Sequence, residues 1–170
     1  MRHFVEEVLE EDRHLFEKDG HQVILEKGAD ARVALDSVAM RMVLDNLIEN
    51  AARYSPRGTV IRIRLNRDLR RCRVDVIDAG RGIARKDLKN IFKLFWRGEG
   101  SQASGTGLGL YIVRHIVKDH KGKVWASSPG LGRGSTFSVS LPRVRRYWGI
   151  ADRKRLHVQT EERSGGFHGR

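Results

Sequence analysis

The first half of the chain changes between two apolar patterns, the spacing of a helix and the pattern of a strand. Residues 3–18 have apolar side chains at helical spacing, and an Asp-Gly pair ends that pattern. Residues 21–27, HQVILEK, predict a short strand. A long helix is expected to begin with Asp36 or Ser37 as its cap and to run to about Tyr54, where SPRG follows.

Alternation dominates the second half of the pattern. TVIRIRLN and RCRVDVID flank a turn-like RDLR and predict an antiparallel hairpin. A loop over residues 79–104 carries the short apolar segment LKNIFKLF, and an amphipathic helix then runs to about His120. KGKVWASS and GSTFSVSLP predict a second hairpin. Helices gathered on one face of a mixed, mostly antiparallel sheet make an α+β fold, a two-layer sandwich.

Composition and charge divide the chain into three parts. Residues 1–20 are expected to form an N-terminal helix, residues 21–142 one globular domain, and residues 143–170 a basic tail or linker. The formal net charge of +12 is of the kind seen in nucleic-acid-binding proteins. Many arginines, however, alternate with apolar residues in predicted strands, and no aromatic residues interleave with them. A solvated sheet face is the preferred interpretation, and no nucleic-acid partner is expected.

The cellular location is inferred from features that the sequence lacks. It has no apolar run of about 18 residues that could span a membrane, and its acidic start does not resemble a secretory signal. The single cysteine, Cys72, cannot form an internal disulfide, which favours a reducing compartment. The chain is therefore expected to be cytoplasmic, with no membrane contact of its own.

Two asparagines lie four residues apart on the long predicted helix. Asn46 and Asn50 therefore project from one face, and their amide oxygens suit a hard cation such as Mg²⁺ that also binds phosphate oxygens. Arg53 and Tyr54 follow one turn later, within reach of a phosphate and of a ring. Taken alone, the pair favours a plainer interpretation, the solvated face of an amphipathic helix.

A strand end with two glycines follows at Asp78. Its carboxylate can accept a hydrogen bond from an exocyclic amine, and Gly80 and Gly82 would let a flat ring approach the backbone. An ordinary strand-end turn has the same composition and is an equal alternative.

Three alternate glycines precede the last predicted helix. Gly105, Gly107 and Gly109 allow backbone N–H groups to point into a concavity, and the helix adds its positive end, a combination that binds phosphates. The spacing is neither that of a dinucleotide-binding fold nor that of a P-loop. A flexible hinge is the alternative.

Taken in order, these segments resemble the ATP-binding catalytic domain of sensor histidine kinases, within the GHKL superfamily of ATPases and kinases. The matching motifs span about residues 36–142 and occur in the family's order, which makes the resemblance specific. They are DNLIENAARYS (N box), DAGRGI (first glycine box), IFKLFWRG (F box), GTGLGLYIVRHIV (second glycine box) and GLGRGSTFSVSLP, a closing GxGxTF-type segment. The resemblance implies a Bergerat fold.

The resemblance also implies roles for the matching residues. Asn50 would bind Mg²⁺, with Asn46 as its neighbour on the phosphate and metal side, and Arg53 would contact phosphates. Asp78 would accept from the adenine amino group, and Thr136 would close the adenine side. Residues 98–107 would form a lid that becomes ordered around nucleotide. Further implied nucleotide contacts are Tyr54, Gly80, Gly82, Arg97, Gly105, Thr106, Gly107, Leu108 and Gly109, with Phe92 and Phe95 in the F box.

The expected activity is transfer of the γ-phosphoryl group of ATP to a histidine outside this chain. ATPase relatives carry a carboxylate at the first N-box position, where this chain has Asn46, and the flanking Asp45 and Glu49 are expected to point away. None of the seven histidines is followed by an acidic residue and then a proline, the context of a phosphoacceptor. The expected partners are therefore a response regulator and a domain that carries the phosphoacceptor histidine and forms the dimer. Residues 1–20 resemble the segment that joins such a domain to the catalytic domain.

Two other functions remain open from the sequence. One is an anti-sigma-type serine kinase of the same fold, and the other is a nucleotide-binding regulatory module without transfer activity. The kinase could be cytoplasmic in itself or the cytoplasmic part of a membrane-anchored sensor.

Overall fold

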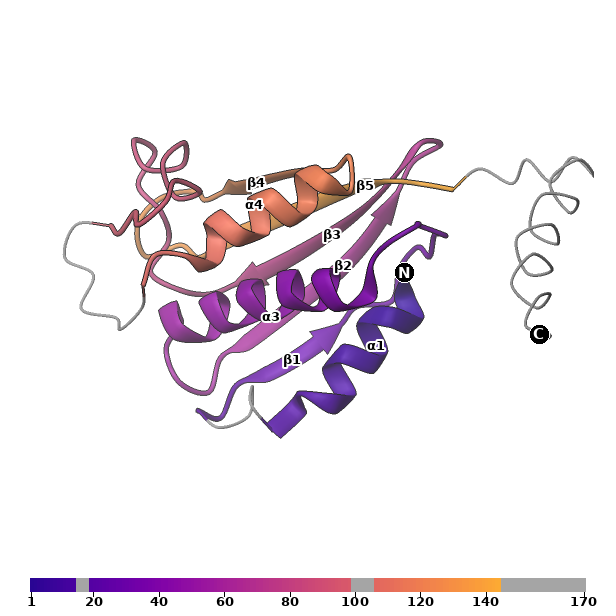
Figure 1. Cartoon of the computed structure of the whole chain (residues 1–170). Helices are drawn as coiled ribbons and strands as arrows, with labels where there is room; N and C mark the ends of the chain where they lie inside the picture. The colour runs from indigo at the N-terminus through magenta and orange to yellow at the C-terminus, as the bar shows by residue number, and fades with distance from the viewer. Residues whose placement is uncertain (15–18, 99–105, 145–170) are drawn as a thin grey trace, which may run out of the picture.

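The computed structural model describes residues 1–14, 19–98 and 106–144. The elements are α1 (Arg2–Glu11), β1 (Gln22–Leu25), α3 (Ser37–Tyr54), β2 (Val60–Arg67), β3 (Arg71–Asp78), α4 (Gly109–Asp119), β4 (Lys123–Ser127) and β5 (Ser135–Pro142). The strands form one sheet in the order β1-β2-β3-β5-β4, and the helices cover one of its faces (Figure 1). β1 and β2 run parallel, and the other strand pairs are antiparallel. The predicted two-layer α+β sandwich is confirmed.

The core lies between the helices and the near face of the sheet. Ile61, Ile63 and Leu65 of β2 are at most 1% exposed, and the arginines between them point to the far face. Ile63 lies opposite Val76 on β3, which in turn lies opposite Phe137 on β5, so one apolar row crosses the sheet. Helix α3 closes the core with Met40, Val43, Leu44, Leu47, Ile48 and Ala51.

The helix predicted over residues 3–18 is interrupted at one residue. α1 ends at Glu11, Asp12 leaves the helical conformation (φ −101°, ψ 9°), and Arg13 and His14 are helical again, whereas residues 15–18 lie outside the described residues. Val5 and Val8 of this helix are 0% and 2% exposed and belong to the same core as the sheet. The core therefore extends into residues that the sequence analysis placed before the globular domain.

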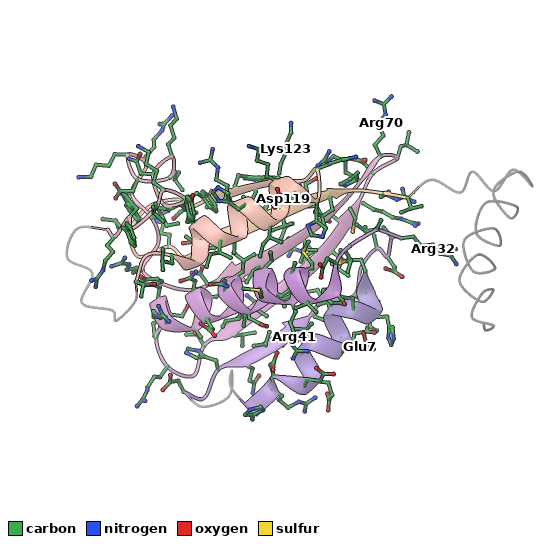
Figure 2. The ribbon with its side chains drawn as sticks, viewed as in Figure 1. Glu7, Arg32, Arg41, Arg70, Asp119 and Lys123 are labelled. Atoms are coloured by element: carbon green, nitrogen blue, oxygen red, sulfur yellow. The ribbon has the colours of Figure 1, made fainter. Side chains whose placement is uncertain are left out.

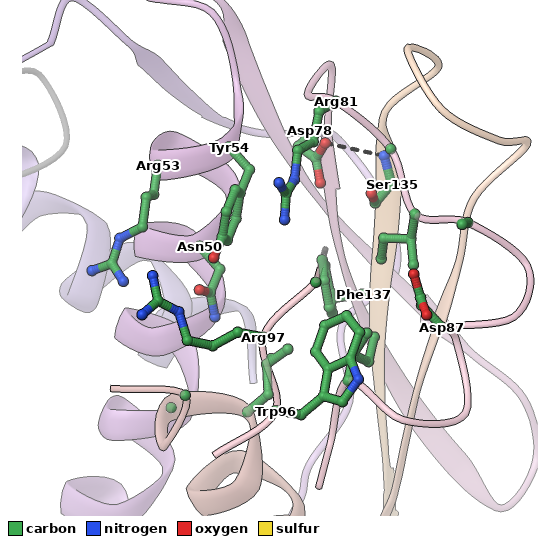
Figure 3. A pocket seen from close by; sticks show the side chains of 18 of the residues that line it. Asn50, Arg53, Tyr54, Asp78, Arg81, Asp87, Trp96, Arg97, Ser135 and Phe137 are labelled. Atoms are coloured by element: carbon green, nitrogen blue, oxygen red, sulfur yellow. Dashed lines mark hydrogen bonds between the residues drawn. The ribbon is translucent and has the colours of Figure 1, made fainter. Parts of the chain in front are cut away.

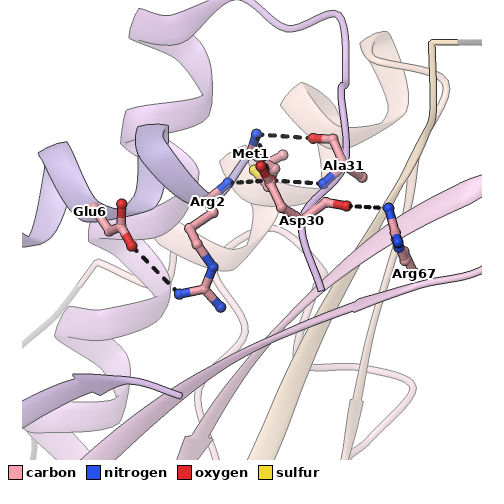
Figure 4. A network of polar contacts seen from close by, with 6 residues as sticks. All are labelled: Met1, Arg2, Glu6, Asp30, Ala31 and Arg67. Carbon is pink, nitrogen blue, oxygen red and sulfur yellow. Dashed lines mark hydrogen bonds and ion pairs between the residues drawn. The ribbon is translucent and has the colours of Figure 1, made fainter. Parts of the chain in front are cut away.

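One carboxylate joins the start of α1 to the loop after β1. Asp30 Oδ1 accepts from the backbone N–H groups of Arg2 (2.9 Å) and Ala31 (2.7 Å) (Figure 4). The N–H groups of a first helical turn have no partner within the helix, so Asp30 caps α1 from a distant part of the sequence. The hydrogen bond from Arg2 is the largest effect on the pKa of Asp30 and lowers it.

The far face of the sheet carries the arginines that alternate with core residues. Arg64 pairs with Glu26 (2.6 Å), and Arg73 pairs with Asp75 (3.0 Å). Asp75 is only 4% exposed and also accepts from the hydroxyl of Ser138 at 2.7 Å. This face is thus exposed at its arginines, as predicted, but its centre is a buried polar network in which carboxylates offset part of the basic charge.

Charged side chains are also found elsewhere on the exterior. Arg32, Arg70 and Lys123 are exposed and project outward at the end of the sheet where the β2–β3 turn lies (Figure 2). Among the helices of the described residues, none combines the length and apolar character that a membrane crossing needs.

Candidate functional site

A cavity of about 590 Å³ opens between the C-terminal half of α3, the start of α4 and the adjoining ends of β3 and β5 (Figure 3). It brings together ten residues that the sequence analysis selected, namely Asn46, Asn50, Arg53, Tyr54, Asp78, Gly82, Arg97, Thr106, Gly107 and Gly109. Gly80 and Leu108 adjoin the cavity without lining it. Gly105, with most of the predicted lid, lies outside the described residues.

Asp78 is fixed at the end of β3 with one oxygen committed and one free. Its Oδ1 accepts from the N–H groups of Gly80 (2.8 Å) and Ser135 (3.0 Å), while its Oδ2 has no hydrogen-bond partner among the described residues. Burial raises the pKa of Asp78, and the two N–H donors oppose that effect. A carboxylate held in this way can accept a hydrogen bond from an amine that enters the cavity.

The glycines after Asp78 are required by the protein's own backbone. A Cβ on Gly80 would lie 2.5 Å from the carbonyl oxygen of Tyr54, and a Cβ on Gly82 would lie 2.0 Å from that of Gly130. Gly82 also has φ +70°, which side chains disfavour. The sequence argument was that these glycines admit a flat ring; in the structure, the atoms closest to their missing side chains belong to the last residue of α3 and to the β4–β5 turn.

Helix α3 presents its amides to the cavity. Asn46 Nδ2 donates to the carbonyl oxygen of Met42 (2.7 Å), which turns its Oδ1 toward the start of α4. There a Cβ on Gly109 would lie 2.4 Å from Asn46 Oδ1, so only glycine permits this contact. Asn50 lines the same cavity one turn further along. Amide oxygens on one face of a helix are suitable ligands for Mg²⁺.

The N-terminus of α4 is open toward the cavity. Its N-cap, Leu108, offers no side-chain hydrogen bond, and the first bond within the helix joins the N–H of Ile112 to the carbonyl of Leu108 at 2.9 Å. The N–H groups of residues 109–111 thus have no partner within the helix. Gly107, with φ +72°, turns the chain into this position. N–H groups without a partner in the helix, together with the positive helix end, are suited to bind an anion.

The prediction for Thr136 is wrong by one residue. Thr136 lies opposite Ile77 in the sheet and does not line the cavity, whereas Ser135 and Phe137 do. Because strand residues alternate between faces and Phe137 belongs to the core, the residue that shares its face is Ser135. That alternation was visible in GSTFSVSLP and could have corrected the assignment.

Charged and aromatic residues that the sequence analysis did not select also line the cavity. Glu49 does so, contrary to expectation, and pairs with Arg53 at 3.9 Å. Arg81, between the two glycines of DAGRG, places its guanidinium carbon 4.5 Å from the ring centroid of Tyr54. Trp96, in IFKLFWRG, lies on the side of the cavity opposite Arg81 (Figure 3). All three residues lie inside motifs that the sequence analysis had recognised, and this position was the sequence feature that could have identified them as cavity residues.

The F box divides between core and surface. Phe92 is 6% exposed and packs in the core, whereas Phe95 is 65% exposed and has φ +57°.

In the part of the chain that the structure describes, no group of three or more His, Cys, Asp or Glu residues could hold a metal ion.

Comparison with known proteins supports one family. The family model described as histidine kinase-, DNA gyrase B- and HSP90-like ATPase matches residues 35–145. Sensor-like histidine kinase SenX3 of Mycobacterium tuberculosis is 40% identical over 116 residues, which are 65% of this chain and 28% of SenX3. Adaptive-response sensory kinase SasA of Synechococcus elongatus is 36% identical over 146 residues, or 84% of this chain and 37% of SasA. The chain thus spans well under half the length of these relatives.

Solved structures agree with the sequence relatives. The mycobacterial sensor histidine kinase MprB superposes with a TM-score of 0.73 at 26% identity, and the match covers 84% of this chain and 94% of that one. The family match over more than half of the chain and the shared fold lead to one conclusion: the chain belongs to the histidine kinase-, DNA gyrase B- and HSP90-like ATPases, as an ATP-binding catalytic domain of the sensor histidine kinase type.

Proposed function

We propose that this chain binds ATP with Mg²⁺ and donates the γ-phosphoryl group to a histidine that lies outside it. The observation that carries the proposal is the convergence of three different chemistries on one cavity. These are the free carboxylate oxygen of Asp78, the amides of Asn46 and Asn50, and the open N-terminus of α4.

At one end of the cavity, Asp78 selects the base. Adenine presents an amino group where guanine presents a carbonyl oxygen, and Asp78 Oδ2 is able only to accept while it is ionised. Ser135 and Gly80 hold the carboxylate through its other oxygen, so the free oxygen keeps one direction.

At the other end, the phosphates would meet the N–H groups at the start of α4 and the guanidinium of Arg53. Asn50 and Asn46 would hold Mg²⁺ through their amide oxygens, and phosphate oxygens and water would complete its ligands. When bound, the ion neutralises charge on the phosphate oxygens, which is the main requirement of phosphoryl transfer. The protein's own task is to position the phosphates and to keep the acceptor side of the cavity open.

A specific observation keeps ATP hydrolysis as a second candidate. Glu49 lines the cavity, whereas Asp45 does not and instead lies 4.0 Å from Arg41. Because Glu49 already pairs with Arg53, we propose that it orients this arginine and does not act as a base for water. Glu49→Gln should then weaken ATP binding no more than Arg53→Gln does, and a loss of phosphate release at unchanged ATP affinity would favour hydrolysis as the function.

Base recognition is tested with a variant that keeps the loop. In Asp78→Asn the side-chain oxygen can still accept from Gly80 and Ser135, and an NH₂ group replaces Oδ2. A donor then faces the adenine amino group, and we expect ATP to bind about 10- to 100-fold more weakly by calorimetry. GTP should bind weakly to both proteins. Equal ATP affinity in wild type and variant would refute the assignment.

Transfer is tested by adding the missing partner. The chain is incubated with γ-labelled ATP, Mg²⁺ and a separate dimerisation domain of a histidine kinase, with the same domain lacking its phosphoacceptor histidine as the control. We expect acid-labile, alkali-stable phosphate on the intact domain alone, and its onward transfer to a response regulator. Acid-stable label on a protein partner would instead indicate a serine kinase, and ATP binding without any label would indicate a regulatory module.

A further inference from the structure

We propose that Arg81 is an additional phosphate-binding residue of this site, held in position by stacking on Tyr54. The inference rests on the proposed nucleotide function and names a residue that the N-box, F-box and glycine-box roles above leave unassigned. Arg81 and Tyr54 both line the cavity, and the guanidinium carbon lies 4.5 Å from the ring centroid (Figure 3).

The backbone of Arg81 is held from two sides. Its N–H donates to the carbonyl oxygen of Tyr54 at 3.0 Å, and its own carbonyl oxygen accepts from the N–H of Gly132 at 2.7 Å. The first bond ties it to the C-terminus of α3 and the second ties it to the β4–β5 turn. The side chain therefore extends into the cavity from a fixed origin.

The side chain extends from the loop after Asp78 toward the segment that carries Arg97. Its Nη2 lies 3.3 Å from the position that a Cβ on Gly98 would occupy. Gly98 directly follows Arg97 in the sequence. Tyr54, on which it stacks, directly follows Arg53 on α3. The guanidinium thus lies between the two segments that carry these arginines, while the start of its side chain lies beside Asp78 (Figure 3).

The charge of Arg81 has no carboxylate partner among the residues that the structure describes. Within residues 1–14, 19–98 and 106–144, no Asp or Glu oxygen lies within 4.0 Å of its guanidinium, whereas Arg53 of the same cavity pairs with Glu49. An exposed cation at the mouth of a cavity is available to an anionic ligand at little cost in broken contacts. It also strengthens the positive potential that attracts such a ligand.

Stacking leaves the donors of Arg81 free. The face of a guanidinium interacts with an aromatic ring, and its N–H groups point outward in the plane of the group. Arg81 can therefore stay on Tyr54 while its edge donates two parallel hydrogen bonds to phosphate oxygens. This dual use needs arginine, because the ammonium group of lysine has neither the flat face nor the paired donors. The ligand class that fits is a nucleoside di- or triphosphate.

The test compares ligands that differ only in phosphate. Calorimetric titrations of the wild-type chain and of Arg81→Gln with ATP, ADP and adenosine separate a phosphate contact from a base contact. We expect about tenfold weaker binding of ATP and ADP in the variant, as for one lost charge-assisted contact, and adenosine affinity unchanged within twofold. Arg81→Lys should recover only part of the loss. Arg85→Gln, an exposed arginine of the same loop outside the cavity, is the matched control and should change nothing.

Three outcomes would overturn the proposal. An equal loss for adenosine would make Arg81 a base contact, and unchanged affinity for all three ligands would make it a bystander. Tighter binding would show that the guanidinium occupies ligand space in the empty cavity. Failure of the proposed function gives a different result: if the wild-type chain binds neither ATP nor ADP, both the function and the role of Arg81 are refuted. Normal ATP binding that depends on Asp78 but not on Arg81 refutes this inference alone.

Discussion

Asp45→Asn is expected to make the domain more stable at neutral pH. Asp45 lies where α3 meets the end of α1, with its side chain 31% exposed and its Oδ1 buried without a hydrogen-bond partner. Burial, followed by the neighbouring carboxylate of Asp12, raises the pKa of Asp45 to about 6. Arg41 compensates only partly, because it lies 4.0 Å away and its two terminal nitrogens pair with Glu11 and Asp12.

The magnitude follows from the difference between the folded pKa and the ordinary value of 3.8. At about 1.4 kcal/mol per pK unit, keeping Asp45 ionised in the fold at pH 7 costs at most ~3 kcal/mol. Solvent reaches nearly a third of the side chain, so we expect a net effect of about 1 to 1.5 kcal/mol. Because the folded pKa is the higher one, the protonated form stabilises the fold. That contribution is present below about pH 4 and is lost as the pH rises through 6.

The assay is urea unfolding followed by circular dichroism at pH 4, 6 and 7.5. Asp45→Asn should exceed the wild type by about 1 to 1.5 kcal/mol at pH 7.5, by less at pH 6 and by little at pH 4. Glu7→Gln removes an exposed carboxylate of α1 and serves as the control, with no change expected beyond about 0.5 kcal/mol. A variant less stable than the wild type at pH 7.5, or a gain that persists undiminished at pH 4, would refute the reasoning.

Three further substitutions test the geometry of the fold and the cavity. Gly109→Ala should weaken ATP binding at least tenfold by calorimetry while the circular dichroism spectrum is retained, because the new Cβ would lie 2.4 Å from Asn46 Oδ1. Lys121→Gly should raise the free energy of unfolding by about 0.5 to 1 kcal/mol, because residue 121 directly follows the C-cap of α4 and has φ +55°. Asp30→Ala should lower it by about 1 kcal/mol at pH 7 through loss of the cap on Arg2. Since the pKa of Asp30 is lowered in the fold, that loss should shrink as the pH falls through its titration, and a pH-independent loss would contradict the capping role.

Local patterns predicted those elements whose neighbours in space are also near in sequence. The hairpin of β2 and β3 follows from Ile61, Ile63 and Leu65 in alternation with arginines. The start of α3 follows from Asp36, whose side chain accepts from the N–H of Ala39 at 3.0 Å. The parallel pairing of β1 with β2, and the capping of α1 by Asp30, join residues that are distant in sequence. No local pattern marks such contacts.

The same distinction explains the errors in the site. Asn46, Asn50 and Asp78 were identified because each lies at a helix face or strand end that periodicity fixes. Glu49 was expected to point away at 100° per residue, but three residues sum to 300°, which brings it back to within 60° of Asn46. Arg81 follows no period, and only the folded loop shows that its side chain enters the cavity.

The two helices that frame the cavity are fixed relative to each other at both ends. At the far end, His120 Nε2 accepts from the N–H of Asp36 (3.0 Å) and its Nδ1 donates to the carbonyl oxygen of Ile116 (2.8 Å), which joins the end of α4 to the start of α3. At the cavity, Gly109 of α4 lies against Asn46 of α3. The helices therefore run in opposite directions with their spacing set by packing and hydrogen bonds within the domain. It follows that the distance between the amides proposed for Mg²⁺ and the N–H groups proposed for phosphate is determined before any ligand binds, so this half of the site is preorganised.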